Sequence, residues 1–177
     1  RVGVIATGTE LVEPDQIPGV SQIRNSNASQ MMGQLQGLGL NPTYFGIAPD
    51  DENQTYEILA EALKTSDLLV LSGGVSMGEF DFVPSVLTKL GLEIKYQKIA
   101  VQPGKPTTFA TGNGRYVFAL PGNPVSSFVQ FEILVKPFLF KCMGHEWRPP
   151  VWKLPAGEKF SRKKTNRMSW IPVKLSD

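Results

Sequence analysis

Residues 68–74 read Leu68-Leu-Val-Leu-Ser-Gly-Gly74, and this stretch indicates the fold class. Its four consecutive large aliphatic residues are typical of a buried strand in a parallel sheet covered by helices. The two glycines predict a tight turn at the carboxyl end of that strand. On both sides of it, strand-like and helix-like segments alternate from residue 1 to about residue 144. This alternation predicts an α/β fold with a mostly parallel sheet.

Before this stretch the sequence predicts two strands and a helix between them. The strands cover residues 2–6 and 43–47, where apolar residues dominate. The helix covers residues 28–38 and has Ser26 or Asn27 as its N-cap, since both side chains can accept a backbone hydrogen bond there.

Two more helices are predicted around the central strand. One begins at Asp50-Asp51, and Tyr56, Leu59 and Leu63 share its inward face. The other begins near Asp81, after the glycine turn.

The carboxyl-terminal part changes in texture. Residues 92–120 form short β-like runs broken by Pro103-Gly104 and a glycine turn, which predict a hairpin. A helix follows with Asn123 as N-cap and Pro124 as its first residue. Because residues 125–140 are apolar on nearly every side, this helix is expected in the centre of the fold or in an interface.

The length of 177 residues predicts one main domain, with its boundary near residue 145. Residues 146–177 are expected to be a linker and the first strand of a truncated carboxyl-terminal β domain, because residues 170–175 partly alternate between apolar and polar.

Composition excludes several classes of protein. The net charge of +2 gives no footprint for nucleic acid and no membrane-binding face. Cys142 and His145 are the sole cysteine and histidine, which excludes a disulfide framework and a zinc site built from several such ligands. No apolar run approaches the roughly 20 residues that span a bilayer. We therefore expect a soluble, cytoplasmic protein.

The glycine turn is a candidate ligand site, because ligands of open α/β sheets bind beyond the carboxyl ends of the strands. Gly73, Gly74 and Gly78 can bring backbone N–H groups close to a phosphate. A tight turn without any ligand is an equally good interpretation. The pattern is neither G-x-G-x-x-G nor a P-loop. The G-x-S-x-G match around Ser76 is interpreted as coincidence, since His145 is the sole possible triad base.

Four carboxylates follow predicted strands and could hold magnesium, which prefers oxygen ligands. They are Glu10, Asp50, Asp51 and Asp81. Helix capping alone would explain each of the three aspartates. Glu10 lies in a loop that needs no cap, so the functional interpretation is preferred there.

A lysine on a rigid turn is the candidate anion contact. Gln102-Pro-Gly-Lys-Pro106 holds Lys105 between two prolines, which suits a cation aimed at a phosphate or oxyanion. A solvated lysine in a hairpin is the alternative. The helix start at Asn123 could also bind an anion, although helix initiation explains its residues equally well.

Six motifs in order resemble the molybdopterin molybdenumtransferase family of molybdenum cofactor biosynthesis, and together they cover residues 1–143. They are Ala6-Thr-Gly-Thr-Glu-Leu11, Ile23-Arg-Asn-Ser-Asn27, Pro49-Asp-Asp51, Ser72-Gly-Gly-Val-Ser-Met-Gly-Glu-Phe-Asp81, Pro103-Gly-Lys-Pro106 and Leu120-Pro-Gly-Asn-Pro-Val-Ser126. The resemblance implies a three-layer α/β/α molybdopterin-binding domain that forms a homodimer. It also implies magnesium-dependent transfer of molybdate to adenylylated molybdopterin with release of AMP, and the molybdopterin adenylyltransferase as a further partner.

The resemblance carries roles onto matching residues. Glu10, Asp81, Lys105 and Gln102 would be catalytic, and the four carboxylates would bind the metal. The pterin nucleotide would contact a larger set: Asn27, Ser72, Gly73, Gly74, Ser76, Gly78, Pro103, Gly104 and Asn123. Neighbouring domains and the partner subunit would complete the site, so the chain alone is expected to be inactive.

Three positions depart from the usual family pattern: Thr9 and Asn25 stand where aspartate is usual, and Gln102 where lysine is frequent. Gln102 can bond an oxyanion but adds no charge. Three alternatives share the fold: the adenylyltransferase, a related nucleotide-binding protein and a non-enzymatic scaffold domain. The retained acidic residues and Lys105 favour an enzyme, and Pro-Gly-Lys-Pro followed by Leu-Pro-Gly-Asn-Pro favours the molybdenumtransferase.

Overall fold

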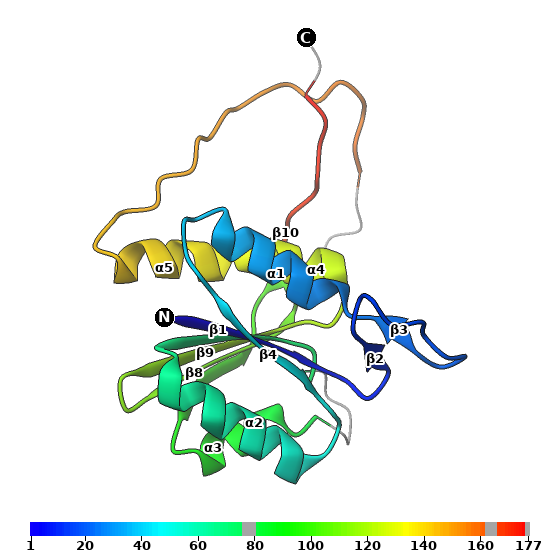
Figure 1. Ribbon diagram of the computed structural model, residues 1–177. Helices are drawn as coiled ribbons and strands as arrows, with labels where there is room; N and C mark the ends of the chain where they lie inside the picture. Colours follow the sequence, from blue (N-terminus) through cyan, green and yellow to red (C-terminus); the bar gives the residue numbers. More distant parts are fainter. Residues whose placement is uncertain (76–80, 162–165, 176–177) are drawn as a thin grey trace.

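The computed structural model describes residues 1–75, 81–161 and 166–175. A six-stranded sheet lies between two layers of helices (Figure 1). The sheet is mostly parallel, which confirms the predicted α/β fold and the three-layer α/β/α sandwich.

The central strand of the sheet is β5 (Leu68–Ser72), the stretch of aliphatic residues. All five of its residues are buried, because parallel neighbours flank it and helices cover both faces. The strand order is β4-β1-β5-β9-β8-β6. The bounds are β1 Val2–Thr7, β4 Thr43–Ala48, β6 Glu93–Lys98, β8 Pro106–Gly112 and β9 Arg115–Leu120. Strands β6, β8 and β9 pair antiparallel, which confirms the predicted hairpin.

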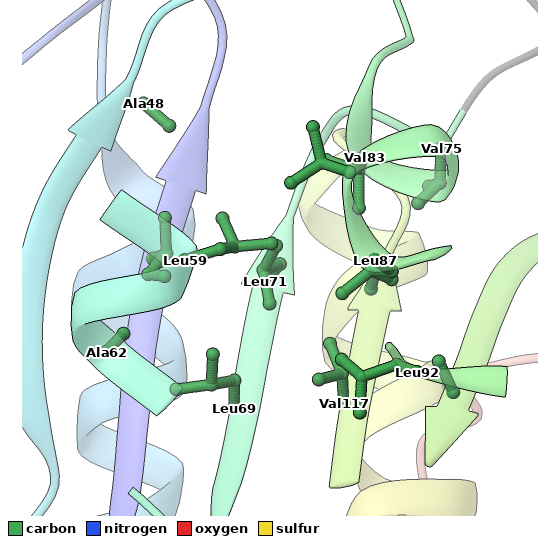
Figure 2. Packing of buried hydrophobic residues seen from close by; sticks show 14 residues of the cluster. Ala48, Leu59, Ala62, Leu69, Leu71, Val75, Val83, Leu87, Leu92 and Val117 are labelled. Carbon is green, nitrogen blue, oxygen red and sulfur yellow. The ribbon is translucent and has the colours of Figure 1, made fainter. Parts of the chain in front are cut away.

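Two clusters of buried residues hold the layers together. On one face, α2 (Glu52–Thr65) and α3 (Val83–Lys89) cover the sheet. Figure 2 shows Leu59 and Leu87 of these helices directed toward Leu71 and Val117 of the sheet. The other face is covered by α1 (Ser26–Gln36), α4 (Pro124–Gln130) and α5 (Lys136–Cys142).

Two details of the predicted helices are wrong. Helix α1 is capped by Asn25, whose Oδ1 accepts from the N–H of Ala28, and not by Ser26 or Asn27. Tyr56 of α2 is 40% exposed, because the buried stripe runs at spacings of four and three through Thr55, Leu59 and Ala62.

The last long helical run starts as predicted, with Asn123 as N-cap of α4. It then changes to a π-helix, η1 (Phe131–Val135), before α5. Phe131 is fully buried, whereas Val125 is 59% and Phe128 is 47% exposed. The run is therefore central on one side and open on the other.

Two pairs of short strands were not predicted. Strands β2 (Leu11–Val12) and β3 (Ile23–Arg24) follow β1 and pair with each other in an arm. In Figure 1 the tail after α5 arches away from the helical layer and comes back to it at β10 (Met168–Ser169), which pairs with β7 (Val101–Gln102). Residues 170–175 form no strand, although their alternation predicted one. A separate carboxyl-terminal β domain, with a boundary near residue 145, stays a prediction.

No helix within the described ranges is both long and apolar enough to span a membrane.

Candidate functional site

A pocket of about 570 Å³ opens at the carboxyl edge of the sheet. Its wall takes residues from the ends of β1, β4, β5 and β9, together with the arm and the segment before β8. Parallel strands all end at this edge, so residues far apart in the sequence meet there. The predicted site residues in the wall are Glu10, Asn27, Asp50, Ser72, Gly73, Gly74, Asp81, Gly104 and Asn123.

The glycine turn packs directly against the end of β1. Gly73 has a φ of +93°, and a Cβ there would overlap the carbonyl oxygen of Thr7 and lie 2.6 Å from its Oγ1. Gly74 has a φ of +63°, and its Cβ would lie 2.6 Å from Cγ2 of Val83. The N–H of Gly73 already donates to the carbonyl of Leu120 at 3.0 Å, so it is not available to a ligand. Ser76 lies outside the described residues.

Gly78, which was predicted to complete this phosphate site, also lies outside the described residues.

Asn27 joins three elements in the pocket wall. Its Nδ2 donates to Oγ of Ser72 at 2.6 Å and to the carbonyl of Gly122 at 2.7 Å. Its Oδ1 is buried and has no hydrogen-bond partner in the described part of the chain. Asn27 therefore serves the pocket rather than the start of the helix, and it keeps one acceptor for a further donor.

The carboxylates divide into those in the wall and one outside it. Glu10, Asp50 and Asp81 lie in the wall. Asp51 lies outside it, and its Oδ1 caps α2 by accepting from the N–H of Gln54 at 2.8 Å. The capping interpretation thus holds for Asp51. It does not hold for Asp81, because Phe82 is the N-cap of α3.

The wall carboxylates do not form a closed metal cage. Across residues 1–75, 81–161 and 166–175, no group of three or more His, Cys, Asp or Glu could hold a metal ion. Asp50 and Thr9 form two hydrogen bonds. Oδ2 of Asp50 accepts from the N–H of Thr9, and the N–H of Asp50 donates to Oγ1 of Thr9, each at 3.0 Å. Magnesium could be held here by one or two carboxylates, with water and ligand oxygens as its other partners.

The Lys105 loop (residues 102–106) borders the pocket. Gly104 and Pro106 lie in the wall, whereas Gln102, Pro103 and Lys105 do not. Lys105 is exposed, and the Gln102–Pro103 peptide bond is cis. The loop thus brings the backbone on both sides of Lys105 to the pocket and leaves the ammonium group in solvent.

Residues 3–141 match the family model described as a probable molybdopterin binding domain. The chain belongs to this family.

Relatives of this molybdopterin-binding domain share its sequence over most of the chain. The molybdopterin molybdenumtransferase of Bacillus subtilis is 42% identical over 138 residues, which are 78% of this chain and 32% of the relative. The enzyme of that name from Staphylococcus aureus is 35% identical over 162 residues, which are 91% of this chain and 39% of the relative. The chain thus spans about a third of the length of these relatives, whose names favour a molybdenumtransferase over an adenylyltransferase.

A solved structure with a similar three-dimensional arrangement confirms the fold. The molybdopterin biosynthesis MoeA protein of Pyrococcus horikoshii superposes with a TM-score of 0.75 at 36% identity. The match covers 82% of this chain and 36% of that protein.

Sequence reasoning missed Arg24 of this molybdopterin-binding domain. Arg24 is the one lysine or arginine among the described residues of the pocket wall, and its Nε donates to the carbonyl of Gln16 at 3.2 Å. It lies in the motif Ile23-Arg-Asn-Ser-Asn27, so the signal was present.

A partly buried hydrogen-bond network at the pocket wall explains why the domain has an amide at position 25. Its Nδ2 donates to the hydroxyl of Tyr44, which donates to Oε1 of Glu13, each at 2.8 Å. Burial and then the Glu13 carboxylate raise the pKa of Tyr44 above its usual range. An aspartate at 25 could cap α1 but could not donate to Tyr44, so it would compete with Glu13 for one proton.

Proposed function

We propose that this chain is the substrate-binding core of a molybdopterin molybdenumtransferase. It would hold adenylylated molybdopterin in the pocket while molybdate is inserted and AMP is released. The single observation that carries the proposal is the convergence of nine of the predicted site residues in one pocket at the carboxyl edge of the sheet. The names of the relatives support the same activity.

The polar groups of the pocket wall suit a pterin nucleotide. The hydroxyl of Ser72 accepts from Asn27, so it keeps its own proton for a phosphate oxygen. The Oδ1 of Asn27, which has no hydrogen-bond partner among the described residues, can accept from an N–H group, and pterins carry several. Gly74 and Asn123 would complete the contacts, with Ser76 and Gly78 kept as proposals from the sequence.

Magnesium is the proposed metal. Glu10, Asp50 and Asp81 would supply one or two oxygen ligands, and Asp51 is left out because it caps α2. When bound, the ion would offset the negative charge of the ligand's pyrophosphate.

Molybdate would meet the Lys105 loop as a substrate. The ammonium group of Lys105 supplies the charge, and Gln102 can add a neutral hydrogen bond. Arg24, in the pocket wall, offers a second cation for an anionic ligand.

The assembly belongs to the proposal too. We propose a cytoplasmic homodimer in which the partner subunit and neighbouring domains complete the site, with the adenylyltransferase as a further partner. The exposed Val125 and Phe128 on α4 support an interface on that side.

The test is molybdate-dependent AMP release by the complete natural protein. Glu10→Gln and Lys105→Ala are each expected to slow it at least roughly tenfold, since each removes a charged contact. Glu57→Gln and Lys64→Ala on the exposed face of α2 are matched controls and should leave the rate unchanged. The 177-residue chain alone should show no turnover, and light scattering of the complete protein should give the mass of a dimer. Unchanged AMP release in both site variants would contradict the proposal.

A further inference from the structure

We propose that Gln130 is a positioning residue that fixes the Lys105 loop beside the pocket. This inference rests on the proposed function, in which Lys105 contacts molybdate. No motif of the sequence pointed to Gln130, which lies at the end of α4 and outside the pocket wall.

Gln130 reaches the loop from a fully buried position. Its side chain has no exposed surface, and its Nε2 donates to the carbonyl of Pro103 at 2.7 Å. The contact continues at Gly104, where a Cβ would overlap Nε2 of Gln130 and lie 2.6 Å from its Cδ. Gly104 has a φ of +101°, so the loop and the glutamine fit only because this residue has no side chain.

The backbone of the loop is held by hydrogen bonds to its carbonyl groups. The Gln102 carbonyl accepts from the N–H of Trp170 at 2.8 Å, and the Lys105 carbonyl accepts from the N–H of Ile99 at 3.0 Å. The Gly104 carbonyl accepts from Oγ1 of Thr107 at 2.9 Å. Gln130 satisfies the carbonyl of Pro103. It is the one donor of the four that comes from the helical layer.

The chemistry of the buried amide indicates more than packing. Oε1 of Gln130 has no hydrogen-bond partner among the described residues, although it is buried. An apolar side chain would avoid the unpaired Oε1 but would leave the Pro103 carbonyl without this donor. The amide therefore acts through its N–H group, which donates to the Pro103 carbonyl of the Lys105 loop.

The helix also changes form at this point. The π-helix η1 begins at Phe131, directly after Gln130, and such segments occur frequently at functional sites.

Fixing the backbone matters because Lys105 itself is exposed and its side chain is flexible. A long side chain reaches an oxyanion reproducibly only when its Cα is held in place. Loss of the Gln130 hydrogen bond should loosen the loop and weaken the use of molybdate, while the binding of the pterin nucleotide stays unchanged.

The first experiment measures the loop directly in the complete natural protein, by hydrogen exchange of the Ile99 and Trp170 amides. These amides donate to loop carbonyls, so their exchange reports on opening of the loop. Gln130→Met removes the donor and keeps the length of the side chain. We expect exchange at both amides to accelerate by roughly three- to tenfold. Gln34→Met is the matched control. Gln34 lies on α1, and its Nε2 donates to Glu132 of η1, next to Gln130, instead of to the Lys105 loop.

The second experiment is a double-mutant cycle on molybdate-dependent AMP release. Gln130→Met should raise the KM for molybdate about tenfold with the KM for the pterin nucleotide unchanged. In the Lys105→Ala background the same substitution should have no further effect, because Gln130 acts through Lys105. Multiplied losses, or unchanged exchange at Ile99 and Trp170, would overturn the proposal. If the wild-type protein releases no AMP with molybdate, the proposed function has failed, and the exchange measurement alone decides the role of Gln130.

Discussion

At the scale of single residues, Gly73 shows how little space the pocket wall leaves. Because it has no side chain, the turn can lie against Thr7, and its N–H donates to the carbonyl of Leu120. Three strand ends are thereby fixed to one another through backbone atoms. The turn is a structural necessity, and any role in phosphate binding falls to its other groups.

Gly73→Ala should therefore cost more stability than a left-handed backbone alone explains. Strain and overlap together are expected to lower the free energy of unfolding by roughly 2–5 kcal/mol. Gly114→Ala is the matched control, since Gly114 has a φ of +70° and open space around it. That variant should lose only the strain, roughly 1–2 kcal/mol. Equal losses in chemical denaturation of the two variants would show that contact with Thr7 does not matter.

Single residues also show where sequence reasoning stops. Glu10 was predicted at the pocket because it follows a strand, and Asn123 because it begins a helix whose N-terminus could bind an anion. The N-cap of α1 was assigned to Ser26 or Asn27, whereas Asn25 caps the helix. Both asparagines can cap a helix, and only the three-dimensional positions of Ser72 and Tyr44 separate their roles. Gln130 carried no signal, because its partner is a carbonyl 27 residues away.

At the scale of elements, helices α2 and α3 are tied by Glu52. Its Oε1 accepts from the hydroxyl of Ser85 at 2.6 Å and pairs with Nζ of Lys89 at 3.0 Å. The Ser85 hydrogen bond first, and then Lys89, lower the pKa of Glu52 below its usual range. Because the folded pKa is lowered, this contact stabilises the fold above the unfolded pKa and is lost as the pH falls through the folded value.

Glu52→Gln should accordingly destabilise the protein at neutral pH and much less in acid. Glutamate ordinarily titrates at about 4.3, so the difference from wild type should shrink as the pH falls below about 4. Urea denaturation midpoints between about pH 6 and pH 3 measure this, with Glu57→Gln as the exposed control on the same helix. A difference that stays constant over this range would mean that the charge of Glu52 makes no contribution.

The long elements were predictable and the short ones were not. Runs of aliphatic residues predict strands such as β5, and the spacing of apolar residues predicts helices. Strands β2, β3, β7 and β10 have two residues each, too few for any period. The π-helix could not be predicted from the sequence either, because its five residues are as apolar as the α-helical turns around them.

At the scale of the whole molecule, one pocket collects residues that lie more than a hundred positions apart. Glu10 and Asn123 meet there because parallel strands end at a common edge. Alternation of strands and helices was sufficient to predict this edge. It could not predict that Asp51 turns back to its own helix or that the tail returns to hold Gln102.

The central claim is that this pocket binds adenylylated molybdopterin. The most direct measurement is a crystal structure of the complete natural protein with that ligand and magnesium. We expect its phosphates beside Ser72 and Gly74, with the metal on Glu10, Asp50 or Asp81. Density for the ligand at any other place, with the pocket wall untouched, would contradict the account.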